Sequence, residues 1–306
     1  MKRVWLPAFV LNTATILLSV GFSVLVADQQ APPAATPRVE GDLAYAEPKT
    51  ERQTLDVYAP AGGTQRPVIF WIHGGGWQRG DKREVHSKPQ AFVDKGFVFT
   101  STNYRFIPNV TMQQIAGDVA KSIRWVHDHA AAYGGDPDLL FVMGWSAGAQ
   151  LAALVCTDER YLKAEGLSLG NIKGCVAVDG DTYYPALQIH TAEARGEARQ
   201  ASSYRLKFPE GNDRELSSVL HVAKDKGIPP FLLLHIGGHP ESGTAIQAQI
   251  LADALQAANV AVQVVPAEGK THNTLNEDLG RADDKPTKAV FEFVDGILRK
   301  SGQPRE

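Results

Sequence analysis

The sequence predicts an α/β fold in which a mostly parallel central sheet is flanked by helices. Short apolar runs recur along the chain, each long enough for one strand buried on both faces, and helical patterns separate most of them. The chain has 306 residues, 43% of them hydrophobic and 21% charged, which is enough for a large core in one α/β domain. A second domain is not required.

The predicted strands follow one another at intervals along the chain. Each is an apolar run, and the run at 67–77 ends in consecutive glycines before a tryptophan. We expect strands at 53–60, 67–77, 96–105, 139–143, 175–181, 229–237 and 260–265.

The predicted helices lie between and after these strands. Four apolar residues recur at spacings of four, four and three, which places them on one face of a helix: Ile115, Val119, Ile123 and Val126. Further helices are expected at 147–155, 244–258 and 287–299.

Residues 182–225 interrupt this alternation. The segment is polar and stands between two predicted strands. Long insertions in α/β folds often form lids or binding loops, so we expect a small cap over the site. The alternative is a surface excursion that does not contact substrate.

The N-terminus predicts export. Lys2 and Arg3 precede an uncharged, mostly apolar run that ends at Ala27. We interpret residues 1–27 as a signal peptide or a retained membrane anchor, because the run matches the roughly 20 residues that cross a bilayer. Either interpretation places the remaining chain outside the cytoplasm. Residues 28–41 are rich in proline and alanine and predict a disordered linker before the folded domain at 42–301.

Composition argues against several classes of partner. The formal net charge is only −3 and no basic cluster marks a nucleic-acid surface. Cys156 and Cys175 stand in apolar runs without the spacing of a zinc site, so we expect buried thiols, or a disulfide in an oxidising compartment. We expect no metal ion and no cofactor.

Residues 144–148, Gly-Trp-Ser-Ala-Gly, carry the strongest chemical signal. The motif follows a predicted strand and opens a predicted helix, which is the setting of a nucleophile elbow. Ser146 is therefore the candidate nucleophile. It would stand at a helix N-terminus, which favours developing negative charge.

Residues 73–77, His-Gly-Gly-Gly-Trp, form the second signal. Acyl transfer needs preorganised N–H donors for an oxyanion, and glycines allow the backbone to approach the substrate. We assign Gly75 and Gly76 as donors, together with the N–H of Ala147. Trp77 and Trp145 flank these segments and are expected to narrow the substrate pocket.

The candidate general base is His272, which follows the last predicted strand. A histidine at that place fits the chain order serine, acid, histidine. We expect it in a loop before the final helix.

In their order along the chain, HGGGW, SxNYR, GWSAGA, PPFLLLH and GKTH resemble the α/β-hydrolase esterases. The likeness covers residues 42–300. It is strongest to the branch with carboxylesterases, feruloyl and acetylxylan esterases, and kynurenine-formamidase-like enzymes. It implies the α/β-hydrolase fold and ester or amide hydrolysis without a metal, with Ser146, His272 and the three oxyanion donors at the motif positions.

The acid of the triad departs from this pattern. Such enzymes usually carry an aspartate shortly after the histidine of PPFLLLH, where this chain has glycine and histidine. Glu241 is the first carboxylate after that strand, and we expect it to be the acid. Asp179 and Asp181, which follow the preceding strand, are the alternatives.

These residues predict a serine esterase that works through an acyl-enzyme intermediate. We expect substrates with short acyl chains or with acyl groups linked to polysaccharides. A formamidase or amidase with the same triad is one alternative. A catalytically inactive binding protein of the same fold is the other.

Overall fold

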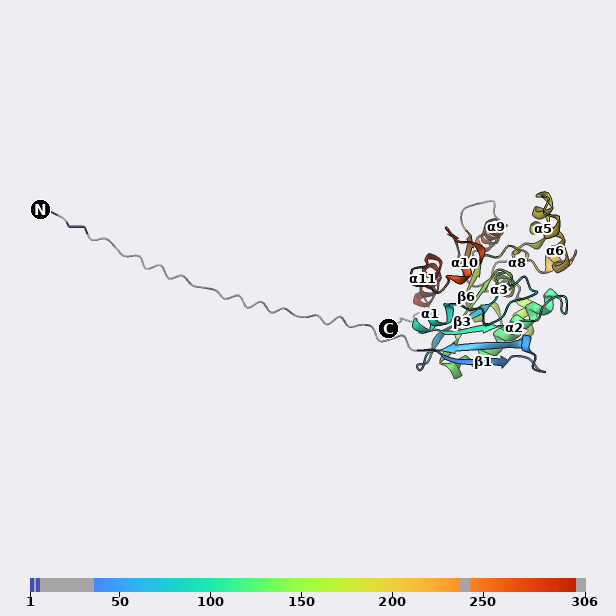
Figure 1. Ribbon diagram of the computed structural model, residues 1–306, viewed down its shortest axis with the longest axis horizontal. Coiled ribbons are helices and arrows are strands. Elements are labelled where there is room, and N and C mark those ends of the chain that lie inside the picture. The colour runs from blue at the N-terminus through green and yellow to red at the C-terminus, as the bar shows by residue number, and fades with distance from the viewer. Residues whose placement is uncertain (3, 6–35, 237–242, 301–306) are drawn as a thin grey trace. The chain divides into compact units, whose positions relative to one another are not determined.

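The computed structural model describes residues 1–2, 4–5, 36–236 and 243–300 (Figure 1). The chain divides into two units, Met1–Ala34 and Ala35–Glu306, and the second holds the folded domain. The predicted signal peptide or anchor lies almost entirely outside the described residues. Within the described part of the chain, no helix is long and apolar enough to cross a membrane.

One eight-stranded sheet forms the centre of the folded unit, in the order β1-β2-β4-β3-β5-β6-β7-β8. β2 pairs antiparallel with β1 and with β4, and every other neighbouring pair is parallel. The predicted mostly parallel sheet is confirmed. The strands are β1 (Arg38–Ala44), β2 (Thr54–Ala59), β3 (Arg66–Ile72), β4 (Val98–Thr102), β5 (Gly135–Trp145), β6 (Ile172–Val178), β7 (Phe231–Ile236) and β8 (Val262–Ala267).

Helices flank this sheet (Figure 1). Their bounds are α1 (Lys88–Asp94), α2 (Met112–His129), α3 (Ala147–Thr157), α4 (Glu159–Ala164), α5 (Pro185–Ala194), α6 (Ala198–Lys207), α7 (Asn212–Glu215), α8 (Ser218–His221), α9 (Gly243–Ala257), α10 (His272–Glu277) and α11 (Lys285–Lys300).

The residues of β3 show how the sheet builds a core on each face. Val68, Phe70 and Ile72 belong to the hydrophobic cluster that includes residues of α2, α3 and α9. Ile69 and Trp71 belong to the cluster that includes residues of α1 and α11. All five are at most 1% exposed. Successive side chains of a strand point to opposite faces, so an uninterrupted apolar run is what a strand buried on both faces requires.

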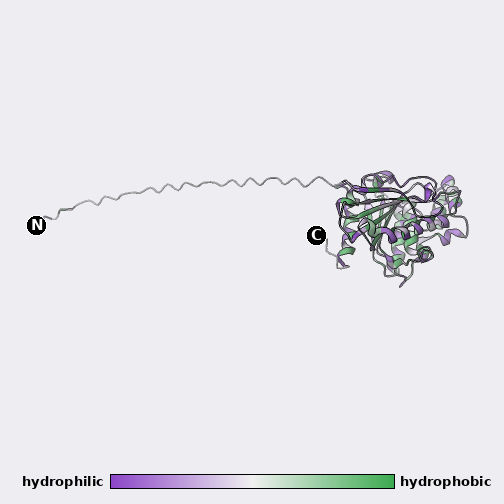
Figure 2. Ribbon diagram, turned by 90° about the horizontal axis from the view of Figure 1, so that it is seen from below, coloured by the Kyte–Doolittle hydropathy of each residue, from purple (hydrophilic) through white to green (hydrophobic). Residues whose placement is uncertain are grey.

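Hydropathy follows the same layering. Figure 2 shows hydrophobic colour in the body of the folded unit and both colours along its helices. α2 and α11 are amphipathic, with one face buried against the sheet.

The predicted linker at 28–41 is wrong in its last residues. β1 begins at Arg38 and pairs with β2 from Arg38 opposite Ala59 to Ala44 opposite Thr54. This edge strand has no buried residue, so its sequence lacks the apolar alternation that marks a half-buried strand. Backbone pairing with β2, which the sequence pattern does not reveal, forms it.

The insertion at 182–225 folds as the helices α5, α6, α7 and α8 between β6 and β7. Its Phe208 packs edge-on against Trp77, with ring centroids 5.3 Å apart. The segment is therefore anchored to the loop that follows β3.

Candidate active site

Ser146 stands between the last residue of β5 and the first residue of α3. Its backbone has φ 57° and ψ −120°, a conformation that an L-residue seldom adopts and that the surrounding fold must enforce. The two motif glycines make this possible. A Cβ on Gly144 would lie 2.2 Å from the carbonyl oxygen of Gly148, and a Cβ on Gly148 would lie 2.2 Å from that of Ile72. Only glycine fits at either place.

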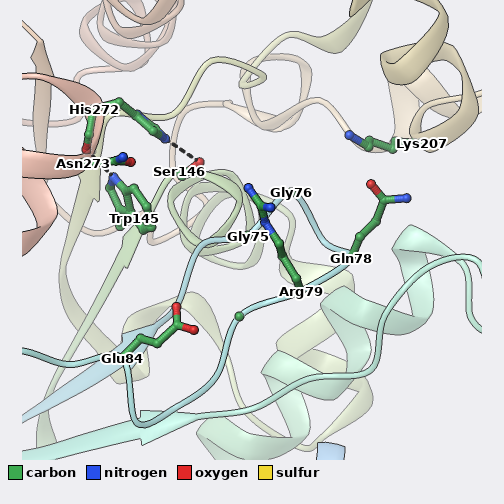
Figure 3. Close-up of a pocket in the computed structure, with 11 residues that line it drawn as sticks. Gly75, Gly76, Gln78, Arg79, Glu84, Trp145, Ser146, Lys207, His272 and Asn273 are labelled. Carbon is green, nitrogen blue, oxygen red and sulfur yellow. Dashed lines mark hydrogen bonds between the residues drawn. The ribbon is translucent and has the colours of Figure 1, made fainter.

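His272 completes a hydrogen-bonded chain with Ser146. Its Nε2 lies 3.0 Å from the Oγ of Ser146, as the dashed line in Figure 3 marks. Its Nδ1 lies 2.6 Å from Oδ2 of Asp179. A histidine that donates from Nδ1 to a carboxylate presents the lone pair of Nε2 to the hydroxyl, which is the arrangement of a general base.

The expectation that His272 lies in a loop is wrong, because His272 is the first residue of α10. Thr271 caps this helix, since its side chain accepts from the N–H of Thr274 and the side chain of Thr274 accepts in return. The start of the helix fixes the backbone of the histidine.

The acid of the triad is Asp179 and not Glu241, which the sequence analysis expected. The side chain of Asp179 is fully buried, and its Oδ1 accepts the N–H of Ile236 at 2.9 Å while Oδ2 meets His272. Asp179 follows β6, the strand next to β5, so its carboxylate emerges one strand away from Ser146. Glu241 itself lies outside the described residues.

Asp181, the other alternative, has a different partner. Its carboxylate accepts the hydroxyl of Tyr204 on α6, and burial raises the pKa of Asp181 above its ordinary value. This hydrogen bond connects α6 of the insertion to the loop after β6.

The glycine loop after β3 faces the same cavity. Gly75 has φ +110° and Gly76 has φ +62°, which turn the backbone out of the extended course of β3. The carbonyl oxygen of Gly75 accepts the N–H groups of Gln78 and Arg79, both at 3.2 Å. Among the described residues, no backbone carbonyl accepts from the N–H of Gly75 or Gly76. Ala147 opens α3, so its N–H has no partner within the helix.

His73 positions this loop, a role that the sequence analysis did not assign. Its Nδ1 lies 2.6 Å from the carbonyl oxygen of Gly74, and Nε2 lies 3.2 Å from Nη2 of Arg52. Tyr104 stacks on the ring at 4.4 Å between centroids, and its hydroxyl donates to the carbonyl of His73. Burial lowers the pKa of His73 to about 4, so the ring stays neutral as these bonds require.

Trp77 and Trp145, which were both expected to narrow the substrate pocket, lie in different environments. Trp145 lines the cavity, its Nε1 donates to the carbonyl of His272 at 3.1 Å, and its ring lies 4.8 Å from that of His272. Trp77 does not line the cavity, and this expectation is corrected. Its side chain is 3% exposed, its Nε1 donates to Gln150, and its ring packs against Phe208 of the insertion.

The cavity itself measures about 470 Å³. Ser146, His272, Gly75 and Gly76 line it, so the nucleophile, the base and the glycine loop share one space. The remaining lining is mostly polar: Gln78, Arg79, Gly80, Glu84, Lys207 and Asn273, with Trp145 (Figure 3).

The described residues do not form a set of ligands for a metal ion. Across the described ranges, no group of three or more histidine, cysteine or acidic residues is arranged to hold a metal ion. Cys156 and Cys175 are both buried and free, as the first of the two sequence interpretations had them.

The profile of the BD-FAE family matches residues 55–255, which include Ser146, Asp179 and the glycine loop. The chain belongs to the BD-FAE family. The match confirms the resemblance to α/β-hydrolase esterases that the motifs indicated.

This BD-FAE-family chain is similar in sequence to a plant protein and similar in structure to two bacterial esterases. A probable isoprenylcysteine alpha-carbonyl methylesterase, ICMEL1 of Arabidopsis thaliana, is 30% identical over 256 residues, which are 78% of this chain and 52% of that protein. The crystal structure of an inhibited esterase B from Lactobacillus rhamnosis superposes with a TM-score of 0.72 at 22% identity, covering 90% of this chain and 91% of the other. The butyrate-bound esterase Est2 of Thermogutta terrifontis gives 0.66 at 25% identity, over 90% and 98%.

These likenesses establish the α/β-hydrolase fold for the BD-FAE-family domain. The chain spans about half the length of the curated relatives it matches.

Proposed function

We propose that this BD-FAE-family protein is a serine hydrolase that cleaves carboxylic esters through an acyl-enzyme intermediate. The observation that carries the proposal is the continuous hydrogen-bonded chain from Asp179 through His272 to Ser146, at a cavity shared with the Gly75–Gly76 loop. A merely binding protein does not need a serine held in a strained turn against a histidine that a buried carboxylate orients.

In the first step, Nε2 of His272 takes the proton of Ser146 as Oγ attacks the ester carbonyl. Asp179 holds the imidazole and stabilises the imidazolium that forms, without taking the proton itself. His272 then protonates the leaving alcohol, and the acyl group stays on Ser146. A water molecule, deprotonated by the same histidine, attacks the acyl-enzyme and releases the acid.

The oxyanion of each tetrahedral intermediate is assigned to the N–H groups of Gly75, Gly76 and Ala147. The loop is preorganised, since Gly75 accepts from Gln78 and Arg79 before any substrate binds. A donor of this kind contributes roughly 3 kcal/mol to the stability of a transition state.

Short acyl groups fit this site best. Trp145 is tied to His272 and stands beside Ser146, so it limits the space next to the nucleophile. The structural neighbour with bound butyrate supports the same substrate size. The polar rim of the cavity suits hydroxyl-rich alcohols, and acyl groups linked to polysaccharides are the finer proposal.

Turnover of 4-nitrophenyl acetate by the wild type and by Ser146→Ala tests the proposal. We expect the wild type to hydrolyse the ester and the variant to lose about six orders of magnitude in kcat. Circular dichroism should show that the variant is folded. A variant with near-wild-type kcat would contradict the proposal.

A further inference from the structure

Two cations line the cavity, and the proposed ester chemistry uses neither of them. Arg79 follows the glycine loop, and Lys207 is the last residue of α6 in the insertion. In Figure 3 both stand on the side of Ser146 away from His272, next to the Gly75–Gly76 turn.

Lys207 is held in place by neutral groups. Its Nζ donates to Oγ of Ser203 at 3.1 Å, and it lies 5.4 Å from the centroid of the Trp77 ring and 5.8 Å from that of Tyr204. The ammonium also faces the loop, since a Cβ on Gly76 would lie 3.9 Å from it. Partial burial lowers the pKa of Lys207, and the negative charge of Asp181 opposes that shift. No carboxylate among the described residues lies within ion-pair distance of it.

Arg79 is the more exposed of the two. Its backbone N–H donates to the carbonyl of Gly75, and Figure 3 shows its side chain extending toward the Gly75–Gly76 turn. Nearby arginines in the described chain are paired: Arg83 with Asp81 and Arg205 with Glu193, both at 2.6 Å. Arg79 forms no ion pair within the described ranges, and its planar fork of donors matches the two oxygens of a carboxylate.

The one acidic residue that lines the cavity in the described chain is Glu84. Figure 3 places it at the end of the drawn loop remote from Lys207, beneath Trp145. In that view both cations lie nearer to the Gly75–Gly76 turn than Glu84 does (Figure 3).

We propose that Arg79 and Lys207 bind an anionic group of the ester substrate, so that the enzyme selects esters carrying a carboxylate near the scissile bond. The inference rests on the proposed serine esterase function and narrows its substrate class to half-esters of dicarboxylic acids and acyl esters of hydroxy acids. Arg79 and Lys207 line the cavity together with the glycine loop, and neither is paired with a carboxylate of the described residues, so they attract such a group and hold it beside the reacting carbonyl.

Paired substrates of matched shape test this selectivity. On the acyl side, ethyl hydrogen succinate carries a carboxylate where ethyl levulinate carries a neutral methyl ketone. 3-Acetoxybenzoate and 3-acetylphenyl acetate make the same comparison on the alcohol side. We expect the wild type to favour the charged member of at least one pair in kcat/KM, and the preference to shrink as salt screens the charges.

For each pair, the ratio to compare is kcat/KM for the charged ester divided by kcat/KM for the neutral ester. Arg79→Gln and Lys207→Met should each lower this charged-to-neutral ratio about fivefold, which is the effect of losing one partly exposed charge pair. Arg205→Gln is the matched control: it removes a cation from the same helix as Lys207, but one already paired with Glu193 and outside the cavity lining. It should leave the ratio unchanged.

The outcomes separate the inference from the proposed function. A wild type that hydrolyses neutral esters but shows no preference for either charged member would overturn the inference and leave the esterase standing. Variants that slow both members of a pair equally would assign the cations to the oxyanion and also overturn it. Absence of turnover on every ester, including 4-nitrophenyl acetate, would overturn the proposed function and the inference with it.

Discussion

Asp179 is the residue whose assignment most changes the chemistry of the site. Its carboxylate is fully buried and uses both oxygens, one on the N–H of Ile236 and one on His272. It therefore holds the histidine in one tautomer and one orientation. A carboxylate with this geometry acts through the histidine.

Asp179→Asn should lower kcat by roughly four orders of magnitude while the protein stays folded, because an amide no longer fixes the Nδ1–H tautomer. Steady-state kinetics with 4-nitrophenyl acetate measures this. Glu241→Gln is the comparison variant, and we expect it to keep the wild-type kcat. The reverse result, with Glu241→Gln inactive and Asp179→Asn active, would return the acid to the loop after β7.

The sequence identified Ser146 and His272 because each stands in a local motif that chemistry constrains. Asp179 carries no such motif: its role depends on β6 lying next to β5 and β7, which only the order of strands in the sheet decides. Trp77 was misplaced for a similar reason, since its contacts with Gln150 and Phe208, which are distant in sequence, place its side chain in the core. Residues set by long-range pairing are the ones that a single sequence describes least well.

The turn between β5 and α3 depends on its glycines. Gly144→Ala should destabilise the protein by about 3 kcal/mol, because the added methyl group meets the backbone of Gly148 at 2.2 Å. Gly296→Ala is the control, since Gly296 lies within α11 and a Cβ there meets nothing within 4 Å. It should stabilise by about 0.5 to 1 kcal/mol. Urea unfolding measures both, and equal effects of the two substitutions would refute the steric account.

Helix α10, which begins with His272, rests on an unusual buried lysine. Lys88 of α1 is 0% exposed, its Nζ donates to the carbonyl of Asn276 at 2.7 Å, and it lies 4.6 Å from the centroid of the Trp71 ring. Burial lowers the pKa of Lys88 to about 7, against a smaller opposing effect of Glu277.

Lys88 binds a different number of protons in the folded and the unfolded chain, so the free energy of unfolding depends on pH. Between about pH 7 and pH 10 the unfolded chain holds the proton on Lys88 and the folded chain has released it, so the free energy of unfolding rises with pH. Lys88→Met should remove this contribution, which amounts to at most about 1.4 kcal/mol per pH unit. Urea unfolding of both proteins from pH 7 to pH 10 measures the difference. Parallel profiles would contradict it.

The strands and main helices were predicted close to their observed bounds because buried apolar runs and helical faces are local signals. β1, α1, α4, α10 and the insertion helices were not predicted. β1 is an exposed edge strand formed by pairing, and α10 is a short helix defined by its cap. α1 and α4 are also short, and α6 of the insertion is largely polar. Each lacks the periodic apolar pattern on which the interpretation relied.

The site assembles at one edge of the sheet. Ser146 and Asp179 follow β5 and β6, and the glycine loop follows β3, all strands that run parallel. In a parallel sheet the carboxyl ends of the strands meet at the same edge, so loops far apart in sequence converge there. The insertion adds Lys207 to this edge, which joins the catalytic residues and the proposed substrate selectivity in one cavity.

Trapping the acyl-enzyme is the most direct measurement of the central claim, covalent catalysis by Ser146. Wild-type protein mixed with 4-nitrophenyl acetate and quenched in acid should gain the mass of one acetyl group, and peptide mass spectrometry should place it on Ser146. Asp179→Asn should accumulate the same adduct more slowly, and Ser146→Ala should acquire none. An acetyl group on another residue, or turnover without any adduct on Ser146 under single-turnover conditions, would contradict the account.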